Sequence, residues 1–406
     1  TALQSEFPPK AVKIGMLGKL NSLKKITSPI IFDPIISSTS GKILLIQDIM
    51  PYLPYVDVFT PNLPEAEMIL QQKIHSPADV EKAAKQFLSL GVKSILIKGG
   101  HANHPSLSQD YWSNGQESFW LTSPRYEQKN YRGTGCVYAS AIAANLALGC
   151  EIKDAIVIAK MYVNRGIRLT QSSFLVHGSW PEEEIDMPYL SDNYIEQIPA
   201  SFPTCGTTPL GLYPIVNNSQ WVEKLLSLGV TTIQLRIKDK LGEELEDEIK
   251  KSIQIAKQYQ ARLFINDYWE LAIKHQAYGV HLGQEDLKIA EIEKIYQAGL
   301  RLGISTHCYY EVARAHTFRP SYLACGPIFP TTSKIMAFAP QGIDRLSRWQ
   351  RTLNSYRWVA IGGINLKNIP AILKSGADGV ALISAITQAK YPEKVTQQFL
   401  QLMGQC

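Results

Sequence analysis

Short apolar runs recur through the second half of the chain, and each of them ends in a polar residue or a glycine. These runs predict eight strands, at Leu212–Val216, Thr232–Arg236, Arg262–Asn266, Gly279–Leu282, Arg301–Ile304, Tyr322–Cys325, Trp358–Ile361 and Gly379–Leu382. Helical patterns separate most of them, for example at Gln220–Leu228, Glu243–Gln260 and Leu287–Ala298. Alternation this regular is typical of a closed parallel (β/α)8 barrel, the TIM barrel.

The first half of the chain also alternates between extended and helical patterns. Extended runs are predicted at Ile30–Phe32, Val56–Thr60 and Ser94–Lys98, and helices at Pro64–Leu70, Ala78–Leu90, Ala139–Leu148 and Ile152–Leu169. This order favours a mostly parallel α/β sheet covered by helices. The segment between the halves contains an acidic run and several prolines, and its hydrophobic residues show no clear periodicity. We therefore predict domains at residues 1–180 and 210–406, with a linker over 181–209.

Composition narrows the class of protein. The 406 residues are 45% hydrophobic and 19% charged, which is typical of a soluble globular protein. The net charge of +5 is mild and favours solubility and an anionic small-molecule substrate. The sequence contains no basic–aromatic tract of the kind that nucleic-acid binders carry. It also contains no apolar stretch long enough to span a membrane and no recognisable signal peptide. The six cysteines show no CxxC spacing, which favours a reducing cytoplasm. A homo-oligomer is compatible with the sequence.

Polar side chains gather where the predicted barrel strands end. Gln234, Arg236 and Lys238 alternate along one strand and its exit, so they face one side. Arginine offers a planar fork of donors and lysine a point charge, a pairing that suits a diphosphate. Asp267 and Asp286 follow the next two strands. Because carboxylates would repel a diphosphate unless a cation lay between them, this set predicts Mg²⁺.

A second phosphate cradle is predicted at the last strands of the barrel. Gly362 and Gly363 form a glycine turn after one strand, and residues 383–385 follow the next. The loops after strands 7 and 8 of such barrels commonly bind a phosphate group. A diphosphate, Mg²⁺ and a separate monophosphate together indicate displacement of diphosphate by a phosphorylated nucleophile.

The motifs QLRIK, FINDY, GVHLGQEDL, GISTH, GPIFPTTSK, AIGGI and ISAI, in this order over residues 210–400, resemble the thiamine-phosphate synthase family. The resemblance implies that the pyrimidine diphosphate is held by Gln234, Leu235, Arg236, Ile237, Lys238, Asn266, Ser305 and Lys334. It implies Mg²⁺ at Asp267 and Asp286. It further implies that the thiazole phosphate is bound by Thr331, Thr332, Ser333, Gly363, Ile383 and Ser384. Ser333 replaces the family's usual threonine and keeps the hydroxyl.

The resemblance also indicates how catalysis proceeds. The aminopyrimidine stabilises positive charge at its exocyclic methylene, so the C–O bond can break before the thiazole nitrogen attacks. Arg236, Lys238, Lys334 and Ser305 are the catalytic residues, which stabilise the departing diphosphate. No general base is required. A lone aspartate at a strand end is often a helix N-cap, and the roles of His281 and His307, structural or functional, stay open.

In the first half, Asp33, the TPNLPEA segment, the Lys98-Gly99-Gly100 turn and Gly133-Thr134-Gly135-Cys136 resemble the hydroxymethylpyrimidine phosphate kinase branch of the ribokinase-like αβα sandwich. Small residues at a helix start can stabilise a transferring phosphoryl group from ATP. The kinase-like residues are Asp33, Asn62, Glu65, Lys98, Gly133, Gly135 and Cys136; for Cys136, packing and catalysis are both open.

Two departures from the kinase family shape the expectation for this half. The family's Gly-rich segment near the start is missing, and Asn130-Tyr131-Arg132 precede Gly133 where the family has a histidine before the glycine. We therefore expect a truncated start, an incomplete kinase site and an exposed sheet edge, within a gene that encodes a bifunctional protein. Two alternatives stay open: a thiazole tautomerase-like barrel, and an amino-terminal half that is a non-catalytic scaffold.

Overall fold

The computed structural model describes residues 8–16, 23–36, 48–102, 104–126, 133–171, 174–331 and 339–405. The chain forms two compact units, Thr1–Ile198 and Pro199–Cys406. Their boundary falls inside the predicted linker 181–209, and part of that segment, Tyr189–Ser191, is a strand of the first unit. None of the helices among the described residues combines the length and the apolar character needed to cross a membrane.

The amino-terminal unit is built on one sheet whose strands follow chain order. Its described strands are β1 (Val12–Ile14), β2 (Ile30–Phe32), β3 (Val58–Phe59), β4 (Ile95–Ile97), β5 (Leu107–Ser113), β6 (Ser118–Pro124) and β7 (Tyr189–Ser191). Strands β1 to β4 pair in parallel, as predicted, whereas β4 to β7 pair antiparallel. The prediction of a mostly parallel sheet is thus right for one half only, because the turn at Asn114-Gly115 returns β6 directly alongside β5.

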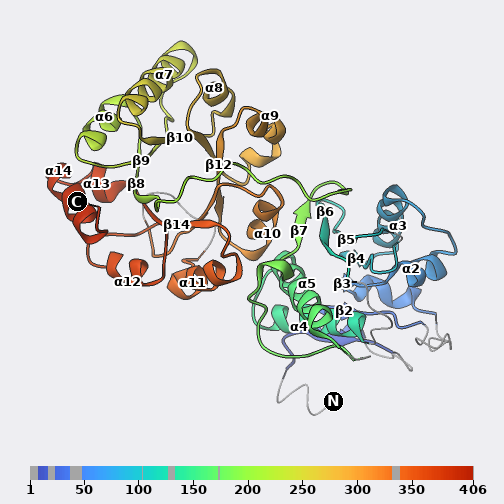
Figure 1. Ribbon diagram of the computed structural model, residues 1–406. Helices are drawn as coiled ribbons and strands as arrows, with labels where there is room; N and C mark the ends of the chain where they lie inside the picture. Colours follow the sequence, from blue (N-terminus) through green and yellow to red (C-terminus); the bar gives the residue numbers. More distant parts are fainter. Residues whose placement is uncertain are drawn as a thin grey trace. The chain divides into compact units, whose positions relative to one another are not determined.

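Helices cover both faces of this sheet (Figure 1). They are α2 (Leu63–Leu70), α3 (Pro77–Ser89), α4 (Thr134–Ala147) and α5 (Ile152–Leu169), with short 3-10 turns η1 (Leu23–Lys25), η2 (Met50–Tyr55) and η3 (Glu184–Asp186). The ends of these four α-helices lie within five residues of their predicted positions. The layered arrangement confirms the predicted αβα architecture.

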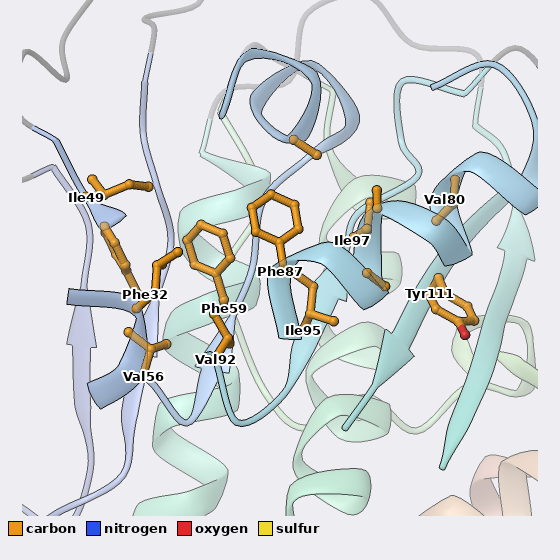
Figure 2. Packing of buried hydrophobic residues seen from close by; sticks show 14 of the residues in the cluster. Phe32, Ile49, Val56, Phe59, Val80, Phe87, Val92, Ile95, Ile97 and Tyr111 are labelled. Carbon is orange, nitrogen blue, oxygen red and sulfur yellow. The ribbon is translucent and has the colours of Figure 1, made fainter. Parts of the chain in front are cut away.

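The core on the α2–α3 face packs aliphatic side chains around a group of phenylalanines (Figure 2). Phe32 and Phe59 project from neighbouring strands with ring centroids 5.5 Å apart, and Phe87 of α3 packs 5.3 Å from Phe59. Ile31 and Val58 alternate with them and point to the opposite face. The strands are buried on both faces, which explains why their sequences are continuous apolar runs.

The carboxyl-terminal unit is a closed parallel barrel (Figure 1). Its strands, all within the described residues, are β8 (Gly211–Val216), β9 (Thr232–Leu235), β10 (Arg262–Asn266), β11 (Gly279–Leu282), β12 (Arg301–Thr306), β13 (Tyr322–Cys325), β14 (Arg357–Ile361) and β15 (Gly379–Leu382). Strand β15 closes the barrel against β8. The predicted barrel is confirmed.

Helices surround the barrel. The described ones are α6 (Ser219–Ser227), α7 (Gly242–Gln258), α8 (Trp269–Lys274), α9 (Ile292–Gln297), α10 (Tyr309–Thr317), α11 (Gly342–Thr352), α12 (Ile369–Lys374), α13 (Ser384–Thr387) and α14 (Pro392–Leu402), with η4 (Asp286–Lys288) before α9. The predicted helix Leu287–Ala298 is wrong as one element. It divides into η4 and α9 because the side chain of Asp286 accepts a hydrogen bond from the Gly283 N–H, which fixes a separate turn.

Three large rings fill the barrel interior. Tyr213, Phe264 and Tyr322 pack against one another with centroids 5.1 to 5.9 Å apart. Gly303 makes room for one of them, since a Cβ there would lie 2.1 Å from Cζ of Tyr322. The interior is therefore a packed core rather than a pore.

Residues 202–209 cover the amino-terminal end of this barrel. Arginines at the first positions of two strands hold this segment by its carbonyl oxygens: Arg262 donates to Pro209 at 2.7 Å, and Arg357 donates to Gly206 and Thr207 at 2.8 Å. Cys205 is buried in the barrel core. The opposite end of the barrel, where the strands terminate in polar residues, carries the candidate site.

Candidate active site

Strands β9, β10, β11 and β12 are neighbours in the barrel, so their carboxyl ends meet at one rim. This rim gathers the residues predicted to bind the diphosphate and metal: Gln234, Arg236, Lys238, Asn266, Asp267, Asp286 and Ser305. Leu235 and Ile237 belong to the same segment, but each side chain is only 1% exposed. Both residues are therefore packed in the barrel core.

Lys238, Asp267 and Asp286 form a cluster at the rim. Lys238 Nζ lies 2.5 Å from Asp267 Oδ2, with 51% and 23% of the two side chains exposed. Burial raises the pKa of Asp286, and the neighbouring Asp267 carboxylate raises it further, against the lowering effect of the Gly283 N–H. Two carboxylates thus compete for the same space, an arrangement that a shared cation would stabilise.

The backbone of Asp267 supports a functional role for this turn. Its φ of 65° lies in the left-handed region, which an aspartate adopts at a cost of about 1 kcal/mol or more. The Asp267 N–H donates to the His281 carbonyl oxygen at 3.0 Å, which holds the residue in this conformation. Strain of this kind is concentrated at functional sites.

Within the described ranges, no group of three or more His, Cys, Asp or Glu side chains could enclose a metal ion. The pair Asp267 and Asp286 nevertheless fits Mg²⁺, which commonly binds one or two carboxylates and completes its shell with water and substrate phosphate oxygens. The donor set therefore suits a metal that arrives with, or is completed by, a phosphorylated substrate.

Arg236 extends from the same strand end. Its backbone N–H donates to the Val216 carbonyl oxygen at 2.7 Å, which ties it to β8. In the part of the chain that the structure describes, its half-buried side chain makes no ion pair or hydrogen bond. A guanidinium in that state is available to an anion.

Ser305 lies at the end of a buried polar chain that the sequence did not predict. Its hydroxyl is 2.8 Å from His281 Nε2, and His281 Nδ1 is 2.7 Å from the Tyr322 hydroxyl. Tyr322 contacts Tyr213 at 2.8 Å, and Gln234 Nε2 lies 3.4 Å from the Tyr213 hydroxyl. Burial lowers the pKa of His281 to about 4. The inward-facing tyrosines in two predicted strands were the only available sequence signal.

The second predicted cradle lies at the ends of β14 and β15. Gly362 and Gly363 have φ of 98° and 68°, and a Cβ on Gly363 would lie 2.5 Å from the Pro330 carbonyl oxygen. Only glycine permits this approach of the β14 turn to the loop after β13. Thr331 ends the described part of that loop, and Ile383 and Ser384 follow β15. The predicted residues Thr332, Ser333 and Lys334 lie outside the described residues.

In the amino-terminal unit, four kinase-like residues meet where α4 begins. Lys98 Nζ lies 2.7 Å from Asp33 Oδ1, and a Cβ on Gly135 would lie 2.8 Å from that same nitrogen. Burial raises the pKa of the Cys136 thiol, and the Asp33 carboxylate raises it further. Gly133 precedes the helix in the left-handed region, with φ of 86° and no side-chain cap.

Asn62 and Glu65 lie beside this cluster but bond to each other. Asn62 Oδ1 accepts from the Glu65 N–H and Glu65 Oε2 accepts from the Asn62 N–H, both at 2.8 Å. This reciprocal capping box starts α2. An isolated parallel bridge pairs Asn62 with Lys98, and burial raises the pKa of Glu65. The two side chains therefore have a structural role at this position.

Comparison with known proteins places these sites in families. Residues 212–386 match the family model described as thiamine monophosphate synthase, and residues 1–182 match the one described as phosphomethylpyrimidine kinase. A thiamine-phosphate synthase of Photorhabdus laumondii subsp. laumondii is 56% identical over 194 residues, which are 48% of this chain and 90% of the relative.

Two solved structures are also similar. A thiamine phosphate pyrophosphorylase from Pyrococcus furiosus is 31% identical, covers 48% of this chain and 96% of its own, and has a TM-score of 0.43. A phosphomethylpyrimidine kinase from Clostridium difficile is 32% identical, covers 41% of this chain and 72% of its own, and has a TM-score of 0.35. The families predicted from the motifs are confirmed: the chain belongs to the thiamine-phosphate synthase family through its barrel, and it carries a phosphomethylpyrimidine kinase-like domain at its amino terminus.

Proposed function

We propose that the barrel joins an aminopyrimidine diphosphate to hydroxyethylthiazole phosphate, which yields thiamine phosphate and diphosphate. The observation that carries this proposal is the rim cluster, where Lys238 lies beside the paired carboxylates Asp267 and Asp286, and Arg236 follows the same strand β9. Cations next to carboxylates at adjoining strand ends suit a diphosphate bound together with a metal ion.

The residues of this rim have distinct roles in the proposed reaction. Arg236 and Lys238 bind the diphosphate oxygens and stabilise the charge that develops as the C–O bond to the pyrimidine methylene breaks. Ser305 donates a hydrogen bond to the same group, and Gln234 and Asn266 orient the pyrimidine. Asp267 and Asp286 would hold Mg²⁺, which supplies neutralising charge for the diphosphate. Lys334 is assigned to the same task on the strength of its motif.

The thiazole partner needs to be held rather than activated. Its ring nitrogen already has a lone pair, so no general base has to remove a proton before it attacks the pyrimidine methylene. We assign its phosphate to the loop after β13 and the turns after β14 and β15, through Thr331, Thr332, Ser333, Gly363, Ile383 and Ser384. Binding the two substrates at adjacent strand ends brings the nitrogen close to the reacting carbon, which accounts for much of the expected acceleration.

The test uses the full chain with both phosphorylated precursors and Mg²⁺, and measures thiamine phosphate and free diphosphate. Chelation of Mg²⁺ should stop formation of both products, and its return should restore them. Asp267→Asn should lower turnover by about 100-fold or more. The matched control is Glu270→Gln, an exposed carboxylate three residues further on, which should leave turnover unchanged.

The outcomes separate the alternatives. Full activity of Asp267→Asn would refute the metal role of that residue, while absence of both products with the unaltered chain would refute synthase activity itself. Conversion of a thiazole precursor without release of diphosphate would instead favour the tautomerase alternative.

A second candidate function belongs to the amino-terminal unit: ATP-dependent phosphorylation of hydroxymethylpyrimidine phosphate. It is favoured by the Asp33, Lys98 and Gly135 cluster at the start of α4. A helix start bordered by a lysine is suited to phosphate groups. Calorimetric titration of the full chain with ATP and with the pyrimidine tests it, since binding of neither ligand would favour the scaffold alternative.

A further inference from the structure

Four side chains in the barrel core form a continuous hydrogen-bonded chain that ends at Ser305. From Gln234 on β9 it passes through Tyr213 on β8 and Tyr322 on β13 to His281 on β11, and from there to the Ser305 hydroxyl on β12. Tyr213 and Tyr322 are 1% and 0% exposed. Neither tyrosine can contact a substrate, so the chain acts on the site only through its ends.

The order of protons along this chain follows from the chemistry of its members. Gln234 reaches the Tyr213 hydroxyl through its amide nitrogen, which is a donor without a free lone pair. The Tyr213 proton must therefore go to the Tyr322 oxygen, because a buried hydroxyl needs an acceptor and the Tyr322 hydroxyl is the other contact it makes. Tyr322 in turn donates its own proton to Nδ1 of His281.

This order fixes the tautomer of His281. A ring nitrogen that accepts a hydrogen bond carries no proton, so the neutral imidazole is protonated at Nε2. Nε2 then donates to the Ser305 oxygen, 2.8 Å away. Since that lone pair of Ser305 is engaged, the Ser305 proton is directed away from the core and toward the rim.

We infer that His281 is a positioning residue, held as the Nε2–H tautomer by Tyr213 and Tyr322, that keeps the Ser305 hydroxyl oriented as a donor to the diphosphate. The inference rests on the proposed role of Ser305 at the rim. In the reverse tautomer, Ser305 would donate inward to His281 and present only lone pairs to an anionic substrate, which would repel it.

The first test reads the tautomer directly and needs no turnover. Long-range ¹H–¹⁵N spectra of the full chain labelled with ¹⁵N-histidine distinguish protonated from unprotonated ring nitrogens, and loss of one signal set in His281→Gln assigns the residue. We expect a protonated Nε2 and an unprotonated Nδ1. A protonated Nδ1 would overturn the inference, whether or not the chain makes thiamine phosphate.

The second test is a double-mutant cycle between Tyr322→Phe and Ser305→Ala. Each should lower kcat/KM for the pyrimidine diphosphate by about 10- to 100-fold, since each removes or misdirects a hydrogen bond to a charged group. The double variant should be no worse than Ser305→Ala alone, because Tyr322 acts through Ser305. Multiplicative losses would contradict the coupling.

A matched control is present in the same barrel. Tyr356 hydrogen-bonds Nδ1 of His316 at 2.8 Å, a part-buried tyrosine–histidine pair that is not a member of the chain from Gln234 to Ser305. Tyr356→Phe should therefore leave kcat/KM unchanged. An equal loss in Tyr356→Phe would mean that the effect of Tyr322→Phe is one of general packing, and would overturn the inference.

Discussion

Both units of the chain collect charged side chains at the carboxyl ends of parallel strands, but they leave these charges in different states. In the amino-terminal unit, Lys98 and Asp33 form a close pair with side chains only 11% and 2% exposed. In the barrel, Lys238 and Asp267 also pair, yet half of the Lys238 side chain is exposed and Arg236 beside it makes no pair within the described residues.

The difference shows which charges are ready to bind. A buried pair is stabilised by its own partners, and a ligand that uses one of them must replace the other. An exposed or unpaired cation gives up little interaction energy when its side chain binds a ligand instead. The barrel rim is therefore organised for a highly charged substrate, whereas the cluster at α4 satisfies its own charges.

The largest expected effect is on the buried pair. Lys98→Met leaves the buried Asp33 carboxylate with Lys13, 3.9 Å away, as the one remaining ion-pair partner among the described residues. We therefore expect a loss of about 3 kcal/mol in the stability of the amino-terminal unit. Lys238→Met in the barrel should cost less than about 1 kcal/mol, because that pair is half-exposed. Urea denaturation followed by hydrogen exchange mass spectrometry measures each unit separately; equal losses would refute the contrast.

Arg236→Gln should have the opposite profile. If Arg236 contacts the departing diphosphate as proposed, its loss should lower kcat by about 10²- to 10³-fold, while the stability of the barrel should hardly change. Lys257→Ala, an exposed cation in the last turn of α7, is the control. A destabilised barrel with normal turnover would show that Arg236 is structural.

A buried histidine on helix α10, in contrast to the exposed charges of the rim, predicts an acid-sensitive stability of the barrel unit. Burial and, to a smaller extent, the nearby Arg319 together lower the pKa of His316 from 6.5 in the unfolded chain to about 3. Because the unfolded state then binds more protons, stability is complete above pH 6.5 and falls toward pH 3. The slope is about 1.4 kcal/mol per pH unit for each such histidine.

The measurement is urea denaturation of the barrel between pH 7 and pH 4.5. His316→Gln removes one titrating group and should flatten the slope. A slope identical to that of the unaltered chain would mean that His316 titrates normally in the folded protein.

The smallest expected effect separates structure from function at Asn62. Two capping boxes have the same geometry, one from Asn62 to Glu65 and one from Ser76 to Asp79. Asn62→Ala and Ser76→Ala should destabilise the amino-terminal unit similarly, by about 1 kcal/mol. If Asn62 also serves a kinase site, only Asn62→Ala should reduce ATP-dependent phosphorylation. Equal kinase activity in both variants would limit Asn62 to capping.

The sequence predicted the barrel strands because each apolar run is short, buried and ended by a polar residue. It missed β5 and β6, where buried Gln109 and Asp110 interrupt the apolar pattern. The structure shows why these groups are tolerated: Asp110 pairs with the buried Lys160 at 2.8 Å, and Gln109 accepts from Thr122 at 2.8 Å. Partners so distant in the chain leave no local signature.

The candidate site divides in the same way. Arg236, Asp267 and Asp286 could be predicted because position at a strand end is visible in sequence. The chain from Tyr213 to Tyr322 could not, since it joins residues 109 positions apart whose inward direction depends on barrel closure. The left-handed backbone of Asp267 was equally hidden, because no glycine marks it.

The arginine-held segment 202–209 has a consequence for solvent. Because it covers the amino-terminal end of the barrel, we expect water to reach the buried phenols from the opposite end, past Ser305. A substrate bound at the rim would then block this route. The hydroxyl protons of Tyr213 and Tyr322 should therefore exchange with deuterated water more slowly when the substrate is bound. The exchange rate of these buried hydroxyl protons therefore reports whether a substrate occupies the rim.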